Sequence, residues 1–158
     1  MVKIVKTNLL NKMKKYLFLL LLISTNSYSA NLEVIDGDTV KILNINEIDP
    51  KLLPIPNIRI EGIDTPETGK KAKCLLEKKK GSEAKEFVKS FIANKNATFK
   101  IKTITKGVDK GKYSLDKYGR LLADVFVDNV SLADTLIKKG LAKEYHGKGS
   151  KFNWCKNG

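Results

Sequence analysis

Two short stretches of alternating hydrophobic and polar residues lie close together, at residues 31–35 and 39–43. Alternation with a period of two is typical of a strand with one buried face. Between them stands Asp36-Gly37-Asp38, and Asp-Gly between two apolar runs is a strong hairpin signal. The sequence therefore predicts a β-hairpin over residues 31–43.

A third strand is predicted over residues 57–62, where Ile58 and Ile60 share one face. The segment before it, residues 44–56, contains prolines and has no clear period, which favours a loop. The strand ends before Pro66, because proline cannot donate a hydrogen bond to a neighbouring strand.

The next regular pattern has a helical period. Over residues 82–94, apolar residues recur at i, i+3, i+4, i+7 and i+8, which predicts a helix with one apolar stripe. The lysine-rich residues 70–80 before it are interpreted either as a basic loop or as a lead-in to the helix. That basic run either steers nucleic acid or is simply a solvated surface.

Two strands and a second helix complete the pattern. The strands are predicted at residues 97–102 and 121–127, and a Lys- and Gly-rich loop covers residues 105–115 between them. Ser131 begins a motif similar to a capping box, which predicts a helix that ends at Gly140.

Three strands, a helix, two strands and a helix predict a small α+β domain. Five strands with a helix after the third fit a five-stranded Greek-key barrel of the OB type, with two or three packed α-helices. A chain of 158 residues has the size of one domain. We expect that single domain over residues 30–158.

Residues 1–29 are predicted to be a secretory signal peptide. Five lysines and no acidic residue precede an apolar run at residues 16–23, and small and polar residues follow it. The run is too short to span a bilayer, so no membrane anchor is expected after cleavage. We expect cleavage after Ser29, translation from Met1 or Met13, and export to the periplasm or the medium.

The composition narrows the classes of partner. The chain has 30 Lys and Arg against 17 Asp and Glu, a net charge of +13, which falls to +8 without the five lysines of the signal. This charge favours a polyanion, nucleic acid before an anionic membrane, although lysine-rich surfaces also serve solubility alone. The single histidine, His146, excludes a Cys/His zinc cluster, and we expect it to be a solvated tail residue.

Export would allow the two cysteines to pair. Cys74 and Cys155 are 81 residues apart, and a disulfide of that span stabilises a fold by about 4–5 kcal/mol in the chain-entropy model. The alternative is two buried free thiols. We expect the disulfide, because a tether near the end of the chain has an obvious use.

The polar residues that could carry chemistry lie where predicted strands end. Asp38 follows the hairpin turn, and Asp64 and Glu67 follow the third strand. Two carboxylates with the backbone carbonyl of Thr65 would make an all-oxygen site for a hard cation, calcium or magnesium. Glu67, held off that ion, could accept a proton from water. Arginine would then bind phosphate oxygens bidentately, so the combination predicts phosphodiester hydrolysis.

The use of arginine supports this interpretation. Of the 30 basic residues only Arg59 and Arg120 are arginine, and both lie in the stretches just described. A chain that uses lysine for general positive charge and keeps two arginines here indicates a requirement for the planar guanidinium.

These stretches, taken in order, resemble the staphylococcal nuclease (thermonuclease) family. The resemblance spans roughly residues 31–145 and rests on Ile35-Asp-Gly-Asp-Thr-Val-Lys41, Arg59, Asp64-Thr-Pro-Glu67, Asp116-Lys-Tyr-Gly-Arg120 and Gly140-Leu-Ala142. It implies an OB-fold barrel and a calcium-dependent nuclease that cuts DNA and RNA and leaves 3′-phosphate ends.

The resemblance also implies a role for each site residue. The calcium assignment comes from the resemblance, since two carboxylates suit magnesium equally well. The implied roles are calcium ligands (Asp38, Asp64 and the Thr65 carbonyl), a carboxylate near the metal (Asp36), a general base (Glu67), transition-state stabilisation (Arg59 and Arg120), and substrate contacts (Lys117, Tyr118 and Tyr145).

The chain also departs from the family. It ends too early for the closing helix of the best-known member, so we expect the tail at residues 151–155 to be held through Cys74 instead. Two rival functions remain, a non-catalytic OB-fold module that binds single-stranded nucleic acid and an exported protein that binds anionic surfaces. The first would be expected to lose the carboxylates or arginines, and the second explains none of them. We expect a monomer.

Overall fold

The computed structural model describes residues 28–44, 48–52 and 54–157. The predicted signal peptide therefore lies outside the described residues except for Tyr28–Ser29, which form strand β1. In the part of the chain that is described, no helix combines the length and the apolar character needed to cross a membrane.

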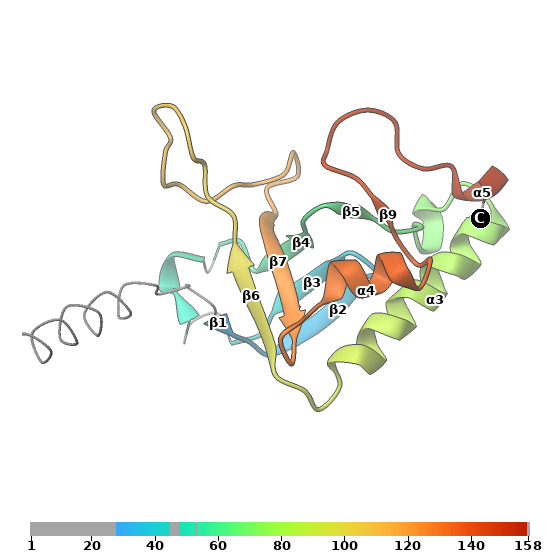
Figure 1. Cartoon of the computed structure of the whole chain (residues 1–158), viewed down its shortest axis with the longest axis horizontal. Helices are drawn as coiled ribbons and strands as arrows, with labels where there is room; N and C mark the ends of the chain where they lie inside the picture. Colours follow the sequence, from blue (N-terminus) through green and yellow to red (C-terminus); the bar gives the residue numbers. More distant parts are fainter. Residues whose placement is uncertain (1–27, 45–47, 53, 158) are drawn as a thin grey trace, which may run out of the picture.

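A curled sheet forms the centre of the fold (Figure 1). Its strands follow the order β1-β6-β7-β4-β3-β2, in which β4 and β7 are parallel and the other neighbours are antiparallel. Strands β1 and β2 lie at opposite edges of the sheet but follow one another along the chain. The two edges are therefore near each other, and the sheet curls toward a barrel. The main strands are β2 (Leu32–Asp36), β3 (Thr39–Ile42), β4 (Asn57–Ile60), β6 (Ala97–Ile101) and β7 (Leu121–Val127). The prediction of a five-stranded OB-type barrel is confirmed.

The predicted hairpin is β2–β3, with an irregularity in register between Val34 and Asp36. The glycine of its turn is required for space. A Cβ on Gly37 would lie 2.9 Å from Thr65 Oγ1, closer than side chains normally approach. The turn therefore packs tightly against the segment that follows β4.

The central strand β4 is buried on both faces, which the alternating sequence pattern did not indicate. Ile58 and Ile60 are in the core, but Arg59 between them is also only 9% exposed. After a turn at Gly62, whose φ is 79°, the chain forms the short strand β5 (Ile63–Asp64). β5 pairs with β9 (Lys143–Glu144), and the two lie outside the main sheet.

The first long helix, α3 (Leu75–Ile92), begins seven residues earlier than the predicted start at residue 82. The second half of the basic run at residues 70–80 is therefore helix, preceded by the 3-10 turn η2 (Gly69–Lys71). Its first turn exposes Leu75 by 85%, so no apolar stripe marks it in the sequence. The Cys74 sulfur accepts a hydrogen bond from the first turn of the helix.

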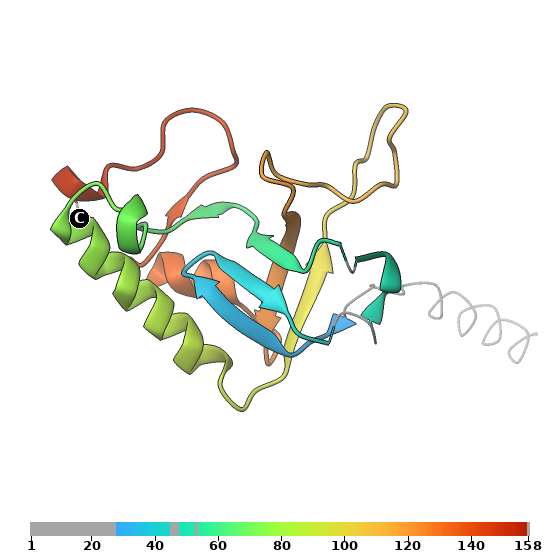
Figure 2. The same ribbon diagram turned by 180° about the vertical axis from the view of Figure 1, so that it is seen from behind.

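Two helices pack against the curled sheet (Figure 2). Helix α4 (Leu132–Lys138) is capped by Ser131, whose Oγ accepts the Asp134 N–H at 3.2 Å, as predicted. It packs against β7, while α3 packs along β2. Leu136 of α4 and Val88 of α3 are fully buried in the core. The other short elements are η1 (Pro50–Leu52), β8 (Val130–Ser131) and α5 (Trp154–Asn157).

The C-terminal tail is fixed to the start of α3. Cys74 and Cys155 form a disulfide in the structure, with their Cα atoms 6.0 Å apart. Trp154, next to Cys155, is 3% exposed. The Phe152 ring packs edge-on against the Trp154 ring, with 4.7 Å between the ring centroids. Figure 1 shows α5 next to the N-terminal end of α3.

Candidate active site

Three of the predicted site residues form a buried ion cluster. Arg59 of β4 lies between Asp38, at the end of the hairpin turn, and Asp64 of β5. Arg59 Nη1 is 2.9 Å from Asp38 Oδ2, and Nη2 is 3.7 Å from Asp64 Oδ1. The three side chains are 11%, 12% and 3% exposed, respectively. Buried charges of this kind require their partners, so each residue depends on the other two.

The Arg59 guanidinium is also bound to the backbone. Nη2 donates to the Ile63 carbonyl at 2.8 Å, and Nη1 lies 3.3 Å from the Ile60 carbonyl and 3.4 Å from the Asp38 carbonyl. Several acceptors in different directions suit the planar fork of arginine and not the single ammonium of lysine. This arrangement gives a physical reason for arginine at this position.

The Asp38 carboxylate is held at both oxygens. Oδ1 accepts the Thr39 hydroxyl at 3.0 Å, and Oδ2 accepts the Thr65 N–H at 3.2 Å. The Thr39 hydroxyl in turn accepts Arg120 Nη1 at 2.9 Å. A chain of hydrogen bonds therefore joins Arg120 to the buried cluster, and Thr39 is the link that sequence reasoning missed.

Arg120 is oriented by Asp116, four residues before it. The Asp116 Oδ2 accepts Arg120 Nε at 2.7 Å and lies 2.6 Å from Nη2, and Oδ1 accepts the N–H groups of Tyr118 and Arg120. Burial opposes ionisation of Asp116, but these hydrogen bonds outweigh it and lower the pKa of the carboxyl. Asp116 is a site residue that sequence reasoning missed, although it lies in the same motif, Asp116-Lys-Tyr-Gly-Arg120.

The predicted substrate-contacting residues lie at the edge of the site. Tyr118 is 71% exposed, with Lys117 Nζ 5.0 Å and Arg120 Cζ 5.4 Å from its ring centre. Tyr145 follows β9, and its N–H donates to the Gly62 carbonyl at 2.8 Å, beside the strand that carries Asp64. His146 is exposed, as expected of a tail residue.

Glu67 lies on the loop after β5, with its side chain 31% exposed. The backbone there touches α3, because a Cβ on Gly81 would stand 2.5 Å from the Glu67 carbonyl oxygen. Asp36 binds the next residue, since its Oδ2 accepts the Thr68 hydroxyl at 3.3 Å. Burial, and then the charges of Asp38 and Glu67, raise the pKa of Asp36, so these carboxylates are close enough to repel one another.

Lys151 is an unpredicted member of the site. Its Nζ lies 2.6 Å from Asp64 Oδ1 and 3.4 Å from Glu67 Oε1. Burial lowers the pKa of Lys151, but the contacts with Asp64 and Glu67 outweigh it and raise that pKa. The tail sequence contains several lysines, so no local pattern distinguishes this one.

The residues fit a hard divalent cation. Asp64 Oδ1 is buried, has no hydrogen bond of good geometry, and has cationic groups as its close polar neighbours. Within the described residues no three carboxylate, imidazole or thiolate groups converge to hold a metal. Asp38 and Asp64 could supply two carboxylate ligands, and the Thr65 carbonyl, water and phosphate could complete an all-oxygen set of the kind that calcium accepts.

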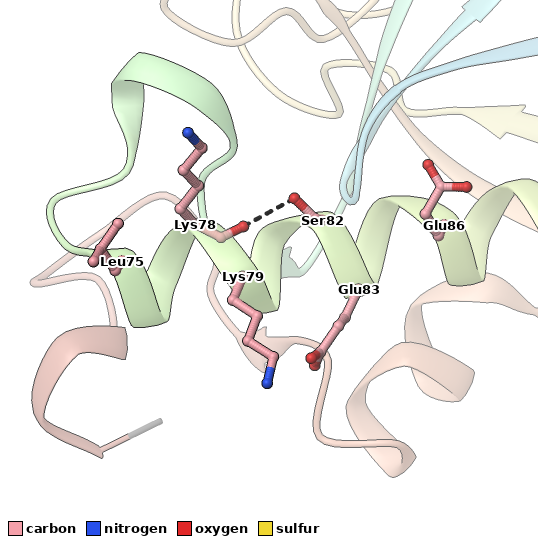
Figure 3. A pocket seen from close by; sticks show the side chains of 6 residues that line it. All are labelled: Leu75, Lys78, Lys79, Ser82, Glu83 and Glu86. Carbon is pink, nitrogen blue, oxygen red and sulfur yellow. Dashed lines mark hydrogen bonds between the residues drawn. The ribbon is translucent and has the colours of Figure 1, made fainter.

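A shallow hollow elsewhere on the surface does not gather its polar side chains around one point. It lies on the outer face of α3, and Figure 3 shows its side chains spreading in different directions from the helix. Ser82 Oγ donates to the Lys78 carbonyl of its own helix at 3.0 Å. The chemistry of the molecule is thus gathered around β4, β5 and the hairpin turn.

The fold and the site together define an OB-type barrel with a carboxylate–arginine centre at one end of its central strands. The family model described as "Staphylococcal nuclease homologue" matches residues 57–154, more than half of the chain. The chain therefore belongs to the staphylococcal nuclease family, as its motifs indicated.

Individual relatives agree with this assignment. The chain is 36% identical over 109 residues to the SPbeta prophage-derived endonuclease YokF and to the endonuclease YncB, both of Bacillus subtilis strain 168. It is 34% identical over 112 residues to the thermonuclease of Staphylococcus hyicus. These matches cover 69%, 69% and 71% of this chain, but 31%, 44% and 56% of the relatives. The matched part of the chain thus spans from just under a third to just over half of their length.

Proposed function

We propose that this protein is an exported nuclease that hydrolyses phosphodiester bonds of DNA and RNA with little sequence specificity and acts as a monomer. The observation that carries the proposal is the cluster of Asp38, Arg59 and Asp64, joined through Thr39 to Arg120. Matches to proteins named endonuclease and thermonuclease support it.

The proton-transfer step is assigned to Glu67. Its carboxylate is partly exposed beside the cluster, so water can reach it, and it would accept a proton from the attacking water. Asp36 stabilises the loop that carries this residue through its bond to Thr68. On the family resemblance, the water oxygen would bond to phosphorus and the P–O5′ bond would break, which gives a 3′-phosphate on one fragment and a 5′-hydroxyl on the other.

The two arginines are assigned to the phosphate. Their guanidinium groups would donate to its oxygens as charge grows in the transition state, a term worth about 10²–10³ in rate per donor. Arg59 approaches from the buried side and Arg120 from the rim, next to Lys117 and Tyr118. These last two, with Tyr145, are proposed to contact the nucleotide.

Asp38, Asp64 and the Thr65 carbonyl are proposed to hold one calcium ion. Bound there, calcium would neutralise phosphate charge and polarise the phosphorus centre. The calcium identity rests on the family resemblance, because magnesium accepts the same oxygen ligands.

Incubation of the purified protein with plasmid DNA and with RNA, in calcium and then in chelator, tests the proposal. We expect both substrates to be degraded in calcium only, and Glu67→Gln to slow cleavage by at least about 10²-fold. Glu83→Gln, on the exposed face of α3, is the matched control and should leave the rate unchanged. If the protein bound nucleic acid but left it uncut, both in calcium and in chelator, the result would favour the rival function of a single-strand-binding module.

A further inference from the structure

Lys151 enters the site from a segment 84 residues away from Glu67 in sequence. It lies 2.6 Å from Asp64 Oδ1, on a carboxylate that is 3% exposed. Its own side chain is 44% exposed, so the ammonium reaches the buried oxygen from the solvent side. The roles proposed above leave this lysine unexplained.

The tail holds Lys151 in place from both sides. Before it, β9 pairs with β5, the strand that carries Asp64. After it, Phe152 packs on the buried Trp154, and α5 is joined by its disulfide to the start of α3. Figure 1 shows this segment arching from β9 to α5. Tethering at both ends gives the lysine a high effective concentration at the site.

A divalent ion bound to Asp64 Oδ1 would compete with Lys151 for that oxygen. Calcium binds carboxylate oxygens at about 2.3–2.6 Å, and the ammonium already stands at that distance from Asp64 Oδ1. Arg59 is farther from this oxygen, at 3.7 Å, and is held by backbone carbonyls. Of these two cations, Lys151 is therefore the one that a metal at Asp64 Oδ1 would displace.

We propose that Lys151 is a built-in counter-ion of the cation site, which competes with the divalent ion for Asp64 and so sets the metal affinity of the protein. The inference rests on the proposed function, because it takes Asp64 as a metal ligand. Without metal, the lysine neutralises a buried carboxylate; with metal, its ammonium moves into solvent. A contact populated about nine-tenths of the time raises the apparent Kd for metal about tenfold.

Calorimetric titration of the full chain with calcium, in the absence of nucleic acid, tests this inference. Lys151→Gln should bind calcium about tenfold more tightly than the wild type. Lys151→Arg keeps the positive charge, so its Kd for calcium should remain near that of the wild type. Lys148→Gln, an exposed lysine of the same tail, is the matched control and should not change the Kd. Equal or weaker calcium binding by Lys151→Gln overturns the proposal.

Thermal denaturation and reduction provide further readouts. In chelator, Lys151→Gln should melt below the wild type, because Asp64 loses a counter-ion, and saturating calcium should remove that difference. Reduction of the disulfide should move the wild-type calcium affinity toward that of Lys151→Gln and leave the variant unchanged. A wild-type affinity that is insensitive to reduction contradicts the role of the tether.

These outcomes are separable from those of the proposed function. Suppose that Lys151→Gln binds calcium more tightly but neither the wild type nor the variant cleaves nucleic acid. That result would support the counter-ion role and reject the nuclease function. Cleavage with equal calcium affinity in every variant would reject the counter-ion alone. Absence of binding up to about 10 mM calcium, above the weakest affinities of protein calcium sites, would reject the counter-ion and the calcium assignment together.

Discussion

The two arginines of the chain occupy surroundings of opposite kinds. Arg59 lies in a central strand with 11% of its side chain exposed, and its donors meet carboxylates and backbone carbonyls from three segments. Arg120 lies where a loop enters β7, is 24% exposed, and takes its orientation chiefly from Asp116 in its own turn. One guanidinium is fixed by the tertiary fold and the other by local structure.

This difference separates two properties that the same side chain contributes. Removal of Arg59 leaves two buried carboxylates without their shared counter-ion, whereas removal of Arg120 leaves Asp116 still bound to two backbone N–H groups. Stability and chemistry are therefore coupled at Arg59 and largely independent at Arg120.

Arg59→Ala and Arg120→Ala should give the largest effects. Both should slow cleavage by at least about 10²-fold, because each removes a donor to the phosphate. Arg59→Ala should also lower the free energy of unfolding by about 3–5 kcal/mol, and Arg120→Ala by about 1 kcal/mol. Urea denaturation and cleavage rates, measured below the melting temperature of both variants, check these values.

Lys100→Ala is the control for this pair, since Lys100 is an exposed cation on β6 that lies outside the site. Lys100→Ala should leave both the cleavage rate and the free energy of unfolding nearly unchanged. Equal losses of stability in the two arginine variants would show that Arg120 contributes as much to the free energy of unfolding as Arg59 does. The more conservative Arg59→Lys should also cost at least about 10²-fold in rate, because an ammonium cannot replace the fork.

The comparison also shows which parts of the site the sequence could predict. The Asp116–Arg120 pair is local, with both partners in one turn, so the motif itself contains the residue that orients Arg120. The hairpin turn and the cap at Ser131 were predictable for the same reason. Their determinants are neighbours in the chain.

The features that sequence analysis missed depend on distant contacts. Lys151 meets Asp64 only because the tail is fixed between β9 and α3. The first turn of α3 carries two exposed leucines, Leu75 and Leu76, and lysines follow them, so no amphipathic period revealed the true start of the helix. The second face of β4 is buried because Asp38 and Asp64 from other segments contact Arg59, which alternation along one strand cannot show.

Gly81→Ala should give an intermediate effect and tests how far the fold positions Glu67. Alanine normally stabilises a helix interior by about 1 kcal/mol relative to glycine. Here the new Cβ would stand 2.5 Å from a backbone oxygen of Glu67, so the loop or the helix must shift. We expect a loss of about 1–3 kcal/mol in stability and about 10-fold in cleavage rate.

Ser82→Ala, the next position of α3, provides the matched control. Ser82 is exposed, and its hydroxyl donates to the Lys78 carbonyl of its own helix, so this substitution should change stability by less than about 0.5 kcal/mol. A Gly81→Ala variant as active and stable as Ser82→Ala would show that Glu67 is not held by this contact.

The smallest effect is expected for Asp116→Asn, which removes the charge that orients Arg120 within its own turn. The pKa of Asp116 is lowered in the folded protein, so its stabilising contribution is present above the unfolded pKa of about 3.9 and is lost as the pH falls through the folded value. The variant should be less stable than the wild type by about 1 kcal/mol at pH 7, since it keeps acceptors for the backbone N–H groups but loses the charge. Urea denaturation of both proteins from pH 7 to about pH 3 should show this difference shrinking as the carboxyl is protonated. A difference that stays constant or grows in acid would mean that the ion pair does not orient Arg120, and that its position depends on the fold as that of Arg59 does.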